Sequence, residues 1–183
     1  MRALGPGSVS SLLKTALDVA YVILGMAATG CFLGLMAVLV GGPFLPPRLP
    51  LEQLNIEVNG RTFDDVQALL PVLAAGLAFV LLYLAGLFLI VGRMRRIFGT
   101  LILGDPFHPD NVRRLRFIGA VLAALLVLGS LGPMLVAMVG PELGEDIGFS
   151  FNPTSWFAVL VVFVLAEVFR EGARLRQEAE LTI

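Results

Sequence analysis

The sequence predicts an all-α integral membrane protein with four transmembrane helices and a small extracellular β-hairpin or three-stranded cap. The first observation is composition: 57% of the 183 residues are hydrophobic, 15% are charged, and the mean hydropathy is +0.90. Soluble proteins have roughly 45 to 50% apolar and about 25% charged residues. The second is that the apolar residues form four blocks, and the third is an uneven distribution of charge between them. The length allows one domain over residues 1–183 and no separate soluble catalytic domain.

Three of the blocks contain no charged residue: residues 19–40, 68–91 and 117–139. Each matches the roughly 20 residues that a helix needs to cross a bilayer core of about 30 Å. We predict helices over about 12–40, 66–98 and 110–139. The first block exceeds the roughly 7 to 15 apolar residues of a signal peptide, so we expect it to remain as a spanning helix.

The fourth predicted helix covers about 154–180 and contains an acid. Glu167 lies eleven residues after Trp156, which places it about 16 Å below an interfacial tryptophan. Thr29, Tyr83 and Ser130 fall at similar depth and complete a predicted set of intramembrane polar residues. We favour a structural role, in which Glu167 locks the helix to its neighbours or pairs with an arginine three residues later. A conformational switch and a proton or ion site remain as alternatives.

Lysine and arginine are distributed unevenly between the loops. Eleven lie at the N-terminus, between the second and third helices, or at the C-terminus, whereas the outer loop 41–65 carries two and the outer loop 140–153 none. Because positive charge remains on the cytoplasmic side, we expect a plasma-membrane protein with both termini and the loop 99–109 in the cytoplasm.

The outer loops carry an alternating pattern. In "LNIEVNGRTF", Asn59 and Gly60 separate two short runs, and Asn-Gly favours a type I′ hairpin turn. One face of the predicted cap would carry Ile56, Val58 and Phe63, with Ile147, Phe149 and Phe151 added by a third strand. We interpret the cap as a lid over helix ends; a ligand or peptide sensor is the alternative.

The sequence has no catalytic constellation. It has one histidine and one cysteine, and neither a phosphate-binding loop nor a nucleophile elbow is present. We therefore expect no enzyme activity, no metal, no cofactor and no direct binding of nucleic acid. His108 precedes Pro109 at a predicted helix start, so we place it at or beside the N-cap.

The arginine-rich segment "GDPFHPDNVRRLR" and the C-terminal tail form the most informative surface. Topology and anionic lipid headgroups, at about 1 kcal/mol per arginine, explain most of the arginines. The mixed-charge tail beside them favours a docking platform. The candidate partner-binding residues are Asp105, Pro106, Phe107, Asn111, Arg113, Arg114, Arg116, Arg170, Arg174, Glu178 and Leu181.

These segments resemble a known family. "GDPF", "N-x-x-R-L-R-x-I-G", "A-E-V-F-R-x-G-x-x-L-R-x-E" and the closing "L-T-I" are similar to the bacterial four-helix membrane proteins of domain of unknown function family 2975. Its members commonly have Ser or another small polar residue where this chain has His108. The family has no established activity, and its genes often neighbour one for a small helix-turn-helix regulator.

The resemblance implies a membrane protein that binds or sequesters a cytoplasmic helix-turn-helix transcription regulator, which is our leading hypothesis. The alternative is a small transporter, a channel component, or an immunity factor against membrane-active compounds, centred on Glu167. The sequence does not fix the oligomeric state.

Overall fold

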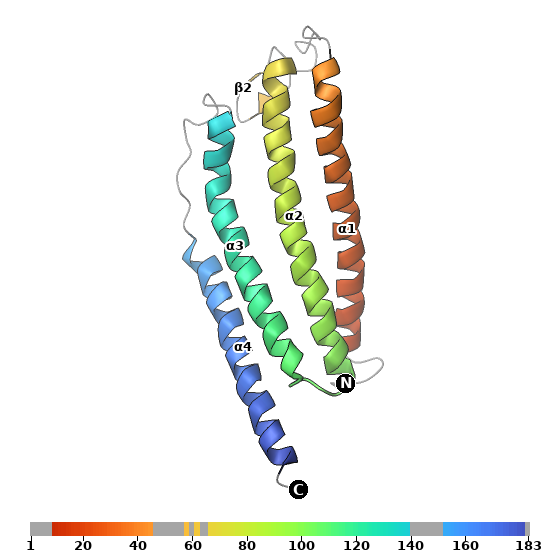
Figure 1. Ribbon diagram of the computed structural model, residues 1–183, viewed down its shortest axis with the longest axis vertical. Helices are drawn as coiled ribbons and strands as arrows, with labels where there is room; N and C mark the ends of the chain where they lie inside the picture. Colours follow the sequence, from red (N-terminus) through yellow and green to blue (C-terminus); the bar gives the residue numbers. More distant parts are fainter. Residues whose placement is uncertain (1–8, 46–56, 59–60, 63–65, 140–151, 182–183) are drawn as a thin grey trace. The chain divides into compact units, whose positions relative to one another are not determined.

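The computed structural model describes residues 9–45, 57–58, 61–62, 66–139 and 152–181. It contains the helices α1 (Val9–Gly41), α2 (Val66–Ile102), α3 (Pro109–Val139) and α4 (Pro153–Glu180) (Figure 1). A short 3-10 helix, η1 (Gly42–Phe44), follows α1. α2 continues to Ile102, beyond the predicted end at residue 98.

Three of the four helices are long and apolar enough to cross a membrane, over Ser11–Phe44, Leu69–Ile102 and Pro109–Gly132. Large apolar side chains of α1 are exposed, such as Met26 at 63%, as expected for a helix that faces lipid. The chain is therefore a multi-pass membrane protein. α4 is not among the three, so the described residues contain three candidate spans where the sequence predicted four. Its apolar run is interrupted by Glu167, and a segment rich in charged residues follows.

The predicted β cap is wrong. The structure is built from helices, and its described β structure is limited to β1 (Glu57–Val58) and β2 (Arg61–Thr62), which pair antiparallel. Strands of two residues are shorter than the roughly 3 to 10 residues of an ordinary strand, and one such pairing makes no sheet that could cover the helix ends. Residues 147, 149 and 151 of the expected third strand, like residues 56 and 63, lie outside the described residues.

The chain divides into two compact units. The first comprises residues 1–25, 85–126 and 152–183, and the second comprises residues 26–84 and 127–151. The second unit contains a small core of Val66 and Leu69, with Leu45 and Leu70 packed against it. In the same unit the Cys31 thiol donates a hydrogen bond to the carbonyl oxygen of Leu77, at 3.3 Å.

The first unit contains parts of all four helices. α1 packs on α2 through the stacked rings of Tyr21 and Phe88, whose centroids are 4.1 Å apart. α2 approaches α3 at Gly86, where an added Cβ would lie 2.6 Å from Leu125. At Gly119, α3 packs against a phenylalanine of α4. Within this unit α2 therefore lies between α1 and α3, and α4 packs on α3; the candidate site belongs to this unit.

Candidate partner-binding surface

The loop between α2 and α3 begins with a helix cap that favours glycine. Gly104 has a φ of 81°, in the left-handed region that glycine adopts without a steric penalty. Its N–H donates to the carbonyl oxygen of Leu101, and the N–H of Asp105 donates to that of Thr100, both at 3.0 Å. These two bonds form a Schellman motif, which satisfies carbonyl groups in the last helical turn. The "GD" of the loop motif therefore ends α2.

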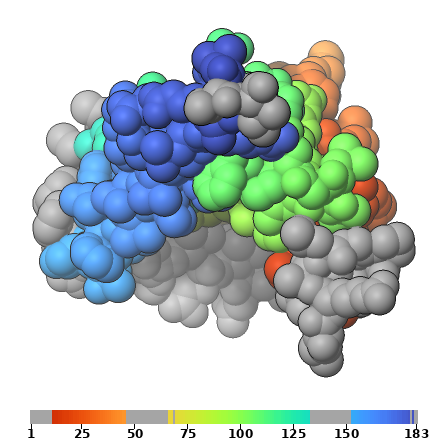
Figure 2. Space-filling model, turned by 90° about the horizontal axis from the view of Figure 1, so that it is seen from below, coloured from red at the N-terminus to blue at the C-terminus, as the bar shows by residue number. Residues whose placement is uncertain are grey.

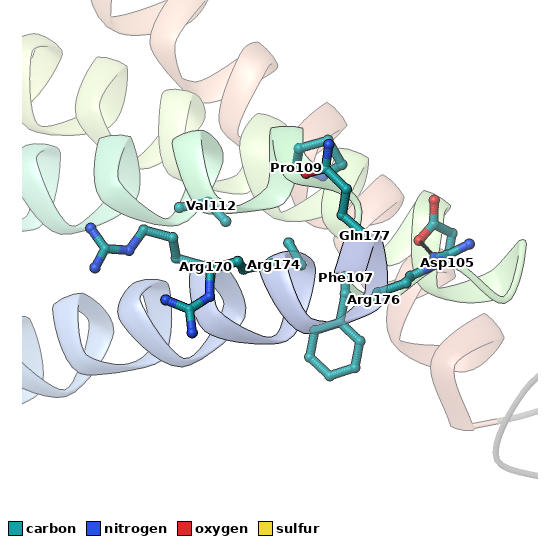
Figure 3. Close-up of a pocket in the computed structure, with 9 residues that line it drawn as sticks. Asp105, Phe107, Pro109, Val112, Arg170, Arg174, Arg176 and Gln177 are labelled. Carbon is teal, nitrogen blue, oxygen red and sulfur yellow. Dashed lines mark hydrogen bonds and ion pairs between the residues drawn. The ribbon is translucent and has the colours of Figure 1, made fainter. Parts of the chain in front are cut away.

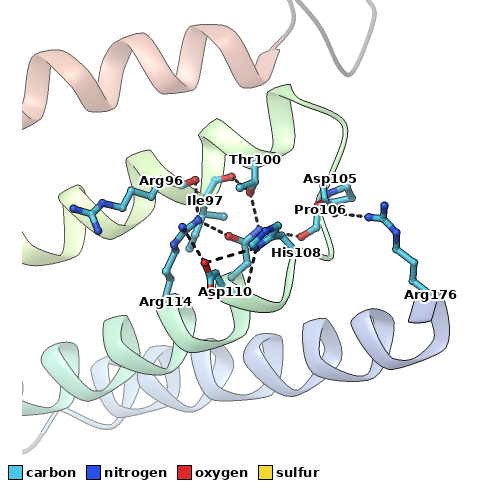
Figure 4. A network of polar contacts seen from close by, with 10 residues as sticks. Arg96, Ile97, Thr100, Asp105, Pro106, His108, Asp110, Arg114 and Arg176 are labelled. Carbon is cyan, nitrogen blue, oxygen red and sulfur yellow. Dashed lines mark hydrogen bonds and ion pairs between the residues drawn. The ribbon is translucent and has the colours of Figure 1, made fainter. Parts of the chain in front are cut away.

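The fully buried side chain of Asn111 holds the loop against both helices. Its Nδ2 donates to Thr100 Oγ1 at 2.7 Å and to the carbonyl oxygen of Pro106 at 3.1 Å, and its Oδ1 accepts from Arg114 Nη1 at 3.0 Å. Thr100 Oγ1 in turn donates to the carbonyl oxygen of Ile97, at 2.7 Å. Figure 4 shows this network of polar contacts. A buried amide is costly unless it is hydrogen-bonded, so the asparagine of the motif closes the turn between α2 and α3.

The first turn of α3 is capped by the histidine before it. His108 Nδ1 accepts a hydrogen bond from the N–H of Asp110 at 3.2 Å, and the carbonyl oxygen of His108 accepts from the N–H of Asn111 at 2.9 Å. Pro109 occupies the first helical position, where its missing N–H costs nothing. The predicted capping role of His108 is confirmed.

The last turns of α4 lie against this loop. The Asp105 carboxylate forms an ion pair with Arg176, and the Phe107 and Phe169 rings lie with centroids 5.6 Å apart. A Cβ on Gly172 would lie 2.5 Å from the Phe107 ring, so glycine permits this approach. The paired acid and arginine are 71 residues apart in the sequence, and they join two distant segments into one surface (Figure 2).

We refer to residues 103–109 and 169–181 as the loop–tail surface. A cavity of about 610 Å³ lies in it, a volume within the roughly 300 to 1,000 Å³ of ligand sites. Its lining combines the apolar side chains of Phe107, Val112 and Ala173 with the charged side chains of Arg170 and Arg174, and Figure 3 shows the pocket. Protein interfaces likewise combine apolar groups at the centre with polar groups at the rim.

Most arginines near the loop–tail surface have carboxylate partners. Glu167 pairs with both Arg170 and Arg116, the latter at 3.5 Å. Arg174 pairs with Glu171 at 2.9 Å and with Glu178 at 3.3 Å. The tail therefore presents a charge-balanced face rather than a simple basic one.

A second group of arginines has no carboxylate partner among the described residues. Arg93 lies 4.6 Å above the Phe117 ring, and neither Arg96 nor Arg113 forms a side-chain ion pair within the described ranges. These three lie on α2 and α3, and none of them lines the cavity of the loop–tail surface.

The structure places the predicted site residues in three settings. Asp105, Pro106, Phe107, Arg170, Arg174 and Glu178 belong to the loop–tail surface, as does Leu181, which is 83% exposed. Asn111 lies outside this surface on α3, and its fully buried side chain offers no contact to a partner. On α3, Arg114 and Arg116 form ion pairs with carboxylates. Arg113 belongs to the group that has no carboxylate partner among the described residues. Thr100, Gly172 and Arg176, which contact the loop residues, were not predicted as site residues. The glycine in "R-x-G" of the tail motif was the available signal for Gly172.

The predicted intramembrane polar residues divide between the two units. Glu167 belongs to the first unit, whereas Thr29, Tyr83 and Ser130 belong to the second. The Glu167 side chain is 53% exposed and has two arginine partners. This pairing favours the structural interpretation of Glu167 over a proton or ion site.

Metal ligands do not cluster in the part of the chain that the structure describes: no group of three or more His, Cys, Asp or Glu side chains could hold an ion.

Comparison with known families gives a match to the model described as "Protein of unknown function (DUF2975)" over residues 49–183, which confirms the resemblance. No curated protein and no solved structure matches the chain.

Proposed function

The chain belongs to the DUF2975 family, whose function is unknown, and we propose that it is a membrane-anchored interaction protein that binds a cytoplasmic helix-turn-helix transcription regulator through the loop–tail surface. Such a protein would hold the regulator at the membrane and away from DNA. The proposal assigns no enzyme activity and no cofactor to the chain.

The observation that supports the proposal is the joining of loop and tail around one cavity. Phe107 contacts both Gly172 and Phe169 of α4, so the family's two sequence motifs meet at one place. The cavity between them offers apolar walls for a partner's side chain and charged groups for its rim. Interfaces of this construction depend on a few buried anchors surrounded by polar contacts.

Charge supports a partner in the cytoplasm. The loop–tail surface lies at the arginine-rich ends of α2, α3 and α4, and the positive-inside rule assigns those ends to the cytoplasmic side. The gene neighbourhood that the family resemblance implies supplies the partner class. The charged rim would distinguish this partner from others by complementary charge.

The test uses the full-length protein in lipid nanodiscs and the purified helix-turn-helix protein encoded by the neighbouring gene. Binding is measured by interferometry. We expect the double variant Arg174→Ala/Leu181→Ala to weaken the Kd at least tenfold, about 1.4 kcal/mol, because it removes an arginine of the rim and an exposed leucine. The matched control, Lys14→Ala/Leu12→Ala on α1, removes the same types of group and should bind as the wild type does.

Two results would overturn the proposal. One is no detectable binding at concentrations up to about 100 μM, which corresponds to roughly −5.5 kcal/mol. The other is equal weakening by the tail variant and the control. A further readout is competition: excess operator DNA should reduce capture of the regulator if membrane binding and DNA binding exclude one another.

A further inference from the structure

We propose that Arg93, Arg96 and Arg113 form a binding site for the phosphate group of an anionic phospholipid. The proposal does not depend on the protein partner, because this site lies on α2 and α3 and shares no lining residue with the cavity of the loop–tail surface. The proposal assigns lipid binding to these three arginines and a structural role to the arginines that are paired with carboxylates.

The site is a pocket of about 220 Å³ between α2 and α3. Arg93 and Arg96 line it from α2, and Arg113, Arg114 and Phe117 line it from α3. At roughly 30 Å³ per water molecule, it has room for about seven waters, which is enough for a phosphate group. Guanidinium groups match phosphate oxygens because they donate two parallel hydrogen bonds.

The pocket has an excess of positive charge. Asp110 is the one acid in its lining, and it lies 3.8 Å from Arg114 in the same lining. The remaining three arginines have no carboxylate partner among the described residues, whereas the arginines of the tail are balanced by glutamates. An anion bound here would therefore neutralise charge that the fold leaves uncompensated.

The framework of the pocket is fixed by contacts that do not need a ligand. Arg114 Nη1 donates to the carbonyl oxygen of Arg96 at 3.2 Å and to Asn111 Oδ1 at 3.0 Å, which joins α3 to α2. The Arg114 side chain is only 19% exposed. The Phe117 ring lies under the Arg93 guanidinium at 4.6 Å and holds it by a cation–π contact. The pocket is thus formed before a ligand arrives, which lowers the cost of binding.

The depth of the pocket selects lipid phosphate over free phosphate. The uncharged run of α2 ends at Val91 and that of α3 begins at Phe117. At 1.5 Å per residue, Arg96 and Arg113 lie about 6 to 8 Å beyond these points. The headgroup layer on each side of a bilayer is roughly 5 to 8 Å thick, so the guanidinium groups lie at the level of the lipid phosphates.

The test is native mass spectrometry of the full-length protein in detergent, titrated with phosphatidylglycerol or phosphatidylcholine. We expect Arg93→Gln/Arg96→Gln/Arg113→Gln to weaken phosphatidylglycerol binding more than tenfold. The matched control, Arg116→Gln/Arg170→Gln/Arg174→Gln, loses the same charge and should change binding less than threefold. The variant Arg93→Lys/Arg96→Lys/Arg113→Lys keeps the charge and the fold, and it should bind several times more weakly than the wild type because lysine lacks the planar fork.

Equal losses in the glutamine variant and its control would overturn the proposal, since binding would then depend on total charge. Unchanged binding in the lysine variant would overturn it too. Displacement of the lipid by millimolar inorganic phosphate would assign the pocket to a free phosphate and refute the lipid assignment. Equal affinity for phosphatidylcholine and phosphatidylglycerol would refute the selectivity for anionic lipid.

Discussion

Replacing Asn111 with alanine should destabilise the protein more than any other single truncation of a polar side chain in the loop. The change removes two hydrogen bonds to neutral groups, at roughly 0.5 to 1.5 kcal/mol each, and one to a guanidinium, at roughly 1.5 to 3 kcal/mol. Thr100 and Arg114 keep other partners, so the cost should lie in the lower half of this range, at about 3 kcal/mol. The largest uncompensated part of this cost comes from the Pro106 carbonyl, because Asn111 is the only side-chain donor found for it among the described residues.

The assay is equilibrium unfolding in mixed detergent micelles, followed by the fluorescence of the single tryptophan, Trp156. The control is Asn152→Ala, which removes an exposed N-cap of α4 and should cost about 1 kcal/mol. Pairing Asn111→Ala with Thr100→Val gives a double-mutant cycle, in which we expect a coupling of at least about 0.5 kcal/mol. Asn111→Ala no more costly than the control, together with a coupling near zero, would refute the assigned network.

Three further predictions concern the loop, the tail and the topology. Gly172→Ala should lower the free energy of unfolding by about 1 to 3 kcal/mol, because its Cβ would lie 2.5 Å from a phenylalanine ring. The control Gly99→Ala has open space around it and should be neutral or stabilise α2 by up to about 1 kcal/mol. Thermal unfolding compares the two variants. Gly104→Ala should cost about 1 kcal/mol in the same assay, because its φ is 81°. In a Cys31→Ser background, Leu181→Cys should react with an impermeant maleimide in inverted membrane vesicles but not in intact cells, and the reverse pattern would refute the predicted orientation.

The helices could be predicted because the bilayer imposes a strong pattern. A run such as residues 117–139 has no charged residue and is long enough to cross the bilayer core as a helix. Whether α4 spans the membrane was harder to predict, since Glu167 and Arg170 interrupt its apolar run. The β cap failed because alternation over a few residues is weak evidence, and nothing in the sequence states whether enough pairs will form to make a sheet.

The sequence singles out the loop and tail residues of the candidate site, but it does not show their contacts. The turn residues from Gly104 to Asn111 were unusual enough to single out, and local chemistry explains them: a positive φ, a proline at the first helical position and a buried amide. The ion pairs could not be predicted from the sequence in the same way. Arg116 and Glu167 are far apart in the sequence. Only the packing of α4 on α3 decides that Arg116 has a carboxylate partner, whereas Arg113 has none among the described residues.

The contact between Asp105 and Arg176 helps to hold the tail against the loop. Both side chains are partly exposed, at 33% and 48%, so their pair contributes no more than about 1 kcal/mol, and the aromatic contact of Phe107 adds roughly 1 kcal/mol. A partner that required the tail to detach would have to replace these contacts, and a cost of about 2 kcal/mol corresponds to about thirtyfold in apparent affinity. A partner that recognised the closed surface would avoid this cost.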